Sequence, residues 1–248
     1  MAISTTINQT YLSDSAGRRV RLRAKTGTVS GGLSSVYGTG IMNVLNIAGN
    51  GTNGIVFPYQ PSITYQQDVE YSKMEVVHAN QDFKMYSKTP ALSLSVEGDF
   101  SVQNQSEGIY ALACIHFLRT VTKMNFGSND TLAGTPPPVL LFDAYGMYMF
   151  NALPVIVTQF AISLPKDVDY VPINCDTLGK VPALNISTAI SNINNTSLST
   201  DPNTGYAWLP AIFTISVQLT VQNTPQRLRA FNLNEFRNGS LLKGGMWA

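Results

Sequence analysis

Two segments of the chain alternate apolar and polar residues over their whole length, which restricts them to strands of a sheet that is buried on one side. In residues 91–102 the apolar positions are Leu92, Leu94, Val96, Phe100 and Val102. In residues 211–221 they are Ala211, Phe213, Ile215, Val217, Leu219 and Val221. Successive side chains of a strand point to opposite faces, so this period predicts two long strands that each have one polar face.

Shorter strand patterns surround these two segments. We expect further strands near residues 18–25, 55–60, 69–78, 139–145 and 154–164. Strands therefore dominate the predicted secondary structure, with turn and loop residues between them.

One segment, residues 106–124, has helical spacing instead. Ile109, Ala113, Phe117 and Val121 recur on one face, and Tyr110, Cys114 and Ile115 extend the apolar surface almost all round. Ser106 is the expected N-cap, and Glu107 suits the positive end of the helix dipole. The sequence predicts a helix that is buried on most sides.

Two polar stretches, residues 26–54 and 174–207, are predicted to be long loops. We interpret residues 1–55 as an N-terminal arm and loop, and residues 56–248 as one domain that contains the inserted loop 174–207. The expected fold class is α+β, mainly β: two packed antiparallel sheets that form a β-barrel, with one flanking helix.

The surface of this chain carries few charges. Charged residues make up 12% of the sequence and the net charge is +1, against about 25% charged residues in ordinary soluble domains. Either other subunits cover much of the surface, which we favour, or the chain is a polar extracellular β protein. The ends are basic, with a net charge of +4 over residues 1–25 and +3 over 226–248, and the middle is acidic. Such asymmetry suits contact between copies or layers, although solvated termini explain it almost as well.

No local motif supports catalysis. Gly49, Gly51 and Gly54 match a dinucleotide-binding pattern, but Pro58 and Pro61 follow, so no helix can begin there to bind a phosphate. A flexible loop is the better interpretation. We therefore expect no enzyme activity and no cofactor.

Metal binding has equally little support. His78 and His116 stand alone, and His116 is expected in the core or at an interface. Asp167 and Asp169 lack the glycine and glutamate of a calcium loop and suggest a surface turn. Cys114 and Cys175 leave a disulfide open, but nothing suggests a fold built on disulfides. We find no apolar signal segment and no run of about 20 apolar residues that would span a bilayer.

Arginines at both ends are candidates for contact between subunits. Arg19, Arg21 and Arg23 would lie on one face of a strand, where guanidinium groups bind carboxylates or phosphates. No aromatic residue interleaves with them, so we favour protein contact over nucleic acid. Arg227 and Arg229 are the corresponding candidates near the C-terminus.

Four segments, in this order and spacing, resemble the contractile-tail tube proteins of bacteriophages, above all the baseplate subunits that initiate the tail tube. They are TPALSLSVEGDFSVQNQSEGIYALACIHFLRTVTKMNFG, GTPPPVLLFDAYGMYMFNALPVIVTQFAISLPKDVDYVPI, WLPAIFTISVQLTVQNTP and the basic tail QRLRAFNLNEFRNGSLLKGGMWA. Together they cover residues 60–248 except the loop 174–205. The first 55 residues fit less well and could be an added arm.

The resemblance implies a virion structural protein that is made in the host cytoplasm. Its sheets would join in a ring of six copies around a channel for DNA or a tape-measure protein. Adjacent tail-tube and baseplate-hub proteins would be its partners. A repeating tube subunit, a secretion-system tube subunit and a monomeric β-sandwich binding module are the alternatives. The long loops and basic ends favour the baseplate position.

The polar face of the strand at 91–102 is the candidate channel lining. It carries no lysine or arginine that would bind passing DNA; its residues are Ser93, Ser95, Glu97, Asp99 and Ser101. An ordinary solvent-exposed face is an equally good interpretation. Pro136, Pro137 and Pro138 are expected to form an extended segment that donates no backbone hydrogen bonds before a strand starts at Val139.

Overall fold

The structure is a computed structural model, and it describes residues 19–24, 45, 54–75, 77–78, 80–124, 126, 133–146, 148–175 and 206–241. Of these residues 46% are in strands and 17% in helices, so the expected mainly β class is confirmed. Most of the N-terminal arm and of the predicted loops 26–54 and 174–207 lies outside the described residues.

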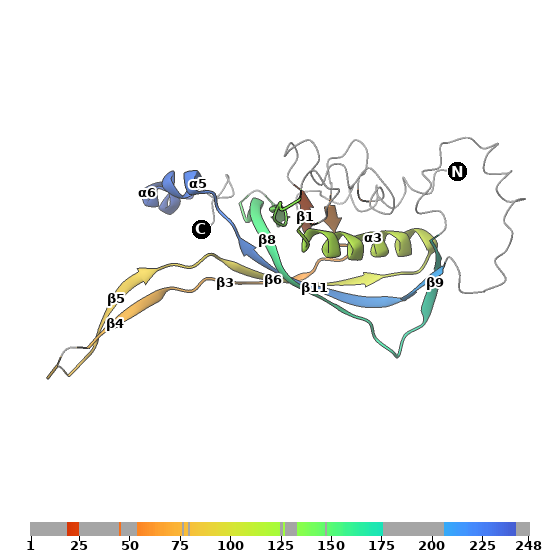
Figure 1. Cartoon of the computed structure of the whole chain (residues 1–248), viewed down its shortest axis with the longest axis horizontal. Coiled ribbons are helices and arrows are strands. Elements are labelled where there is room, and N and C mark those ends of the chain that lie inside the picture. The colour runs from red at the N-terminus through yellow and green to blue at the C-terminus, as the bar shows by residue number, and fades with distance from the viewer. Residues whose placement is uncertain are drawn as a thin grey trace, which may run out of the picture.

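Seven strands form one antiparallel sheet in the order β2-β1-β7-β8-β11-β6-β3 (Figure 1). Their bounds are β1 Arg21–Ala24, β2 Gly54–Val56, β3 Ser62–Gln66, β6 Ser93–Ser101, β7 Leu140–Ala144, β8 Phe150–Ser163 and β11 Ile212–Val221. All of these except β3 were expected from the sequence, although β2 is shorter than predicted and β8 begins four residues earlier than predicted.

The two alternating segments form the central pair of this sheet. β6 and β11 are antiparallel from Ser93 opposite Thr220 to Ser101 opposite Ile212. The apolar residues that the alternation assigns to the inner face are buried, apart from the half-buried Ala211, and the polar residues are exposed or half-buried. Ile212, at the start of β11, lies on the outer face and is exposed. Among the buried positions of β6, residue 98 is a glycine. A Cβ there would lie 2.5 Å from the ring of Phe57, so a larger residue would clash. The predicted faces are therefore confirmed.

Helix α3, Gln105–Val121, covers the apolar face of the sheet (Figure 1). Its N-cap is Asn104, whose side chain accepts a hydrogen bond from the Glu107 N–H at 3.0 Å; the prediction of Ser106 as the cap was wrong. Ser106 instead donates a hydrogen bond to the Asn104 side chain at 2.7 Å. Glu107 lies in the first turn as expected, and it also accepts a hydrogen bond from the Gln103 N–H.

The helix is fixed to the sheet by one buried tyrosine. The hydroxyl of Tyr110 donates to the Val56 carbonyl at 2.7 Å and accepts from the Val56 N–H at 2.9 Å. The N–H and the carbonyl of Val56 in β2 are satisfied in this way. They lie at the outer edge of the sheet, where no further strand is present among the described residues.

Two further antiparallel strand pairs lie at opposite ends of the molecule (Figure 1). One is the hairpin of β4 Glu70–Met74 and β5 Phe83–Lys88, and the other is the pair of β9 Tyr170–Asn174 and β10 Tyr206–Pro210. β4 was expected; β3, β5, β9 and β10 were not. The β9–β10 sheet packs into the same core as the seven-stranded sheet through Ile173 and Leu209. The chain ends in two short helices, α5 Pro225–Arg229 and α6 Leu233–Arg237.

Within the described part of the chain the large sheet is open. Its outermost strands are β2 and β3, and these do not pair with each other. The expected packing of sheets is present, whereas a closed barrel is not formed by the described residues of a single copy and stays a prediction.

Candidate assembly surface

Four neighbouring strands present one continuous polar face on the side opposite helix α3. The strand registers place Thr64 beside Ser95, Ser95 beside Gln218, and Gln218 beside Gln159. The next row contains Ser62, Glu97, Ser216 and Ala161. Strands β3, β6, β11 and β8 contain no lysine or arginine at all. This polar face is therefore rich in hydroxyls and amides and lacks basic groups.

All five candidate channel residues belong to this polar face. Ser93, Ser95, Glu97 and Asp99 are exposed, and Ser101 is half-buried. The carboxylate of Asp99 accepts a hydrogen bond from the Thr214 hydroxyl at 2.7 Å, and the Ser101 hydroxyl lies 3.0 Å from the hydroxyl of Tyr59. Their position on one open face is established; the lining of a channel stays a prediction.

The polar face ends at an unpaired strand edge on each side. β3 pairs with β6 alone, so its other edge has no neighbour among the described strands. On the opposite side, β7 pairs with β8 only as far as Leu140 opposite Val155. In the part of the chain that the structure describes, residues 156–163 of β8 thus have β11 on one side and no strand on the other.

The three prolines explain why the edge of β8 is unpaired. Continuing the register backward from Leu140 would place Pro138, Pro137 and Pro136 beside residues 157–159 of β8. Proline has no N–H to donate, so the ladder cannot continue along this segment. The prediction that these prolines delay the strand is confirmed, and the strand begins at Leu140, one residue later than expected.

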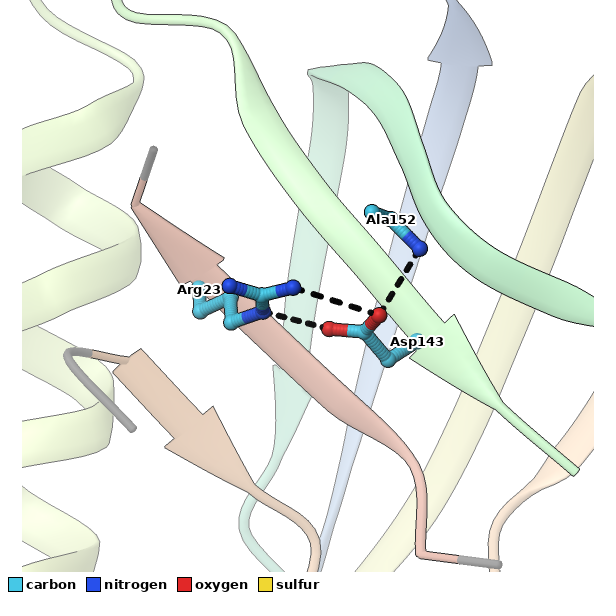
Figure 2. Close-up of polar contacts among 3 residues, drawn as sticks. All are labelled: Arg23, Asp143 and Ala152. Carbon is cyan, nitrogen blue, oxygen red and sulfur yellow. Dashed lines mark hydrogen bonds and ion pairs between the residues drawn. The ribbon is translucent and has the colours of Figure 1, made fainter. Parts of the chain in front are cut away.

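The predicted basic face of residues 19–23 is present, and its arginines already make interactions of their own. Arg19 donates to the backbone carbonyls of Phe57 and Pro58. The guanidinium of Arg23 forms an ion pair with Asp143, and the Asp143 carboxylate also accepts the Ala152 N–H at 2.8 Å (Figure 2). These contacts attach β1 to its neighbours, and a role for Arg19, Arg21 or Arg23 between subunits stays a prediction.

The C-terminal arginines are better placed for an outside partner. Arg229 is exposed and Arg227 is half-buried, both in helix α5, which has no buried residue. α6 has no buried residue either. Their proposed contact with another subunit is untested.

The remaining sequence candidates have structural explanations. Gly54 starts strand β2, so no helix follows the glycine-rich segment there; residues 49–53 lie outside the described part. A Cβ at Gly54 would lie 2.1 Å from the Leu22 carbonyl oxygen, which accounts for the glycine. His78 lies in the exposed turn between β4 and β5. His116 is exposed on α3, so it does not lie in the core, and its alternative placement at an interface stays a prediction.

Among the described residues, no group of three or more His, Cys, Asp or Glu side chains is placed to hold a metal ion. Asp167 and Asp169 lie in the turn between β8 and β9, as expected for a surface turn. Cys114 and Cys175 are both free thiols, and burial raises the pKa of the Cys114 thiol.

None of the helices that the structure describes has the length and apolar character needed to cross a membrane. Comparison of the chain with protein-family models gives no match, and the search of curated proteins gives none either.

Proposed function

We propose that this protein is a structural subunit of a bacteriophage contractile tail, which forms a ring of six copies in the tail tube at the baseplate. The ring would connect the baseplate hub to the tail tube, and DNA or the tape-measure protein would pass through it. The single observation that supports this proposal best is the polar face with an unpaired strand edge on each side.

The two unpaired edges are suited to each other. Strands β8, β11, β6 and β3 alternate in direction. If β3 of one copy lies beside residues 156–163 of β8 in the next copy, the new pair is antiparallel like every other pair in the sheet. Such a contact joins two different surfaces, and it closes into a ring when the rotation between copies permits. Closure also removes the exposed edges that otherwise favour aggregation.

The number of strands favours a ring with an open centre. Each copy contributes four strands to the wall, so six copies give a barrel of about 24 strands. Barrels of about eight strands are filled by side chains, whereas those of roughly 16 or more enclose a water-filled channel. Helix α3 and the buried face would then lie outside the channel and the polar face would line it.

The chemistry of the polar face suits a channel that DNA must leave as easily as it enters. Lysine and arginine supply the phosphate contacts that dominate binding to DNA. The four wall strands have none, and Glu97 and Asp99 repel phosphates. A polymer would therefore slide past hydroxyl and amide groups without strong attachment.

A pair of matched variants tests the ring. Thr64 on β3 and Ser95 on β6 are exposed neighbours in register, but only Thr64 lies on the unpaired edge. Thr64→Lys places a charge where the next copy should pair, and charged edge residues discourage strand addition. We expect Thr64→Lys to abolish rings seen by electron microscopy, and Ser95→Lys to keep them. Both variants should unfold thermally like the parent monomer.

Hydrogen exchange of the backbone amides tests the same strand contact independently. On assembly, amide hydrogens in β3 and in residues 156–163 should become protected, because edge N–H groups acquire partners. A full-length protein that assembles with these amides still exchanging freely, or rings that survive Thr64→Lys, would contradict the proposal.

A further inference from the structure

The β4–β5 hairpin has one apolar and one polar face, although it lies entirely in solvent within a single copy. Every residue of both strands is exposed. Met74 pairs with Phe83, and Ser72 pairs with Met85, so these four residues share one face. Met74, Phe83 and Met85 are 53%, 61% and 58% exposed. We call these three side chains the apolar hairpin face.

The opposite face of the hairpin is already satisfied within the chain. Tyr71 and Tyr86 make an edge-to-face ring contact at 6.2 Å. The ammonium of Lys73 forms ion pairs with Asp82 at 3.0 Å and with Glu75 at 3.1 Å. The hydrogen bond to Asp82, and to a smaller extent that to Glu75, raises the pKa of Lys73. An isolated two-stranded hairpin is marginally stable in water. The apolar hairpin face therefore needs a cover that one copy does not supply among its described residues.

A second uncovered unit lies at the same end of the molecule. Residues 225–241, here called the C-terminal unit, contain helices α5 and α6 with no buried residue. Their N-caps, Thr224 and Asn232, stabilise the helices locally. Leu228 and Leu233 are 55% and 51% exposed. The unit thus presents half-exposed apolar side chains on a preformed scaffold.

The two units differ in net charge. The C-terminal unit is basic, with Arg227, Arg229 and Arg237 against Glu235 alone. The hairpin from Glu70 to Lys88 holds three acidic and three basic residues and is neutral. Two C-terminal units therefore repel each other, whereas the neutral hairpin can pack against one without this repulsion.

The position of each unit decides which copies meet. The hairpin continues β3 and β6. In the proposed ring, β3 is the edge that faces the next copy. The C-terminal unit continues β11, which in the next copy lies directly behind the β8 edge. Within one copy the two units leave the sheet in diverging directions (Figure 1). A hairpin that follows its own edge strand therefore extends toward the neighbour's C-terminal unit.

We propose that the apolar hairpin face of each copy packs against the C-terminal unit of the next copy, as a second contact beside the joined strand edges. This inference rests on the proposed ring. It assigns a partner, another copy of this chain, to the two units that are left uncovered in the single copy.

Cross-linking between engineered cysteines tests the contact in the full-length protein. Cys175→Ser removes the half-buried thiol, while Cys114 is buried and stays in place. Met85→Cys with Leu228→Cys is then treated with a short bismaleimide and run on a denaturing gel. We expect a ladder of covalent oligomers up to six chains. The control pairs Met85→Cys with Trp208→Cys, an exposed residue of β10 at the other end of the molecule, and it should remain a monomer.

Each outcome is distinct. Rings in the microscope without a ladder would overturn this inference and leave the proposed function intact. A monomer with an internal 85–228 cross-link would show that the chain covers its own hairpin, which also overturns it. Equal ladders from both cysteine pairs would mean non-specific contact and would count against it. The absence of rings and ladders together would overturn both proposals.

A second pair of variants separates the face from the stability of the hairpin. Phe83→Ser removes an aromatic ring from the apolar hairpin face, and Tyr86→Ser removes one from the opposite face of the same strand. The protein concentration needed for half-maximal ring assembly should rise about tenfold for Phe83→Ser, the loss of one buried apolar contact. It should change little for Tyr86→Ser. Equal effects would overturn the face assignment.

Discussion

At the scale of single residues, Asp143 joins three strands of the sheet. Its carboxylate accepts hydrogen bonds from Arg23 on β1 and from the N–H of Ala152 on β8 (Figure 2). Ala152 has a φ of 49°, and the register between β7 and β8 shifts at this point. A bulge with a positive φ exposes an N–H that the ladder cannot satisfy, and Asp143 satisfies it. The role of Asp143 is therefore structural: its carboxylate holds β1, β7 and β8 together.

Replacing Asp143 should destabilise the fold. Asp143→Ala leaves the Arg23 guanidinium and the Ala152 N–H without this acceptor. The side chains of the Arg23–Asp143 ion pair are only about a quarter exposed. We expect a loss of about 1–3 kcal/mol in the free energy of unfolding, measured with denaturant. Glu75→Ala, which breaks the exposed pair with Lys73, serves as the control and should cost clearly less, because exposed ion pairs are screened by solvent. Equal losses would show that Asp143 has no special role.

At the scale of elements, the proline segment before β7 determines where the wall of the sheet ends. β8 is long enough to be covered on both sides, and β7 would be the natural neighbour of its second half. The three prolines prevent β7 from beginning before Leu140. Residues 156–163 of β8 therefore stay accessible to another chain. A local restriction on backbone donors thus leaves open the strand edge at which we propose that the next copy pairs.

Removing the prolines should exchange assembly for stability of the single copy. With Pro136, Pro137 and Pro138 replaced by Thr, Val and Thr, β7 can extend along the edge of β8, since β-branched residues favour strands. We expect the monomer to melt at a higher temperature and ring formation to fall, followed by light scattering. Replacement of Pro172, an exposed residue of β9 in the separate β9–β10 sheet, should leave assembly unchanged. Unaltered rings in the triple variant would contradict this explanation.

At the scale of the whole molecule, the two ends of the chain are basic and the polar face of the sheet is weakly acidic. Basic residues are concentrated at the N-terminal segment and in the C-terminal unit, while the four wall strands carry Glu97 and Asp99 alone. An assembled ring would therefore have a weakly acidic interior. Phosphates of DNA would be repelled slightly inside it rather than held.

Adding lysines to the polar face should make the ring bind DNA. Ser95→Lys with Gln218→Lys adds two charges per copy inside the proposed channel, at exposed sites. We expect the affinity of rings for single- or double-stranded DNA to rise about tenfold or more, with a steeper dependence on salt. The control, Gln103→Lys with His116→Lys, adds the same charge near helix α3, outside the channel. Equal gains for both variants would place the polar face outside.

The sequence by itself determined the parts of this protein that depend on local repetition. A period of two in 91–102 and 211–221 specified the central strands and their buried faces, and helical spacing specified α3 within a few residues. The prolines specified the start of β7 almost correctly. Short elements were missed because their signals are weak: β9 contains Pro172, and β3 and β10 have five residues each.

Only the tertiary structure decided which groups meet across long separations in the chain. The pairing of Arg23 with Asp143 and the exposure of His116 depend on where each element lies among its neighbours. The choice of Asn104 over Ser106 as the cap is local, since the Asn104 side chain accepts the Glu107 N–H three residues away. The unpaired edges, in contrast, depend on the tertiary structure. A strand edge is open or covered according to the register of residues far away, as for Leu140 opposite Val155, and no local pattern encodes that register.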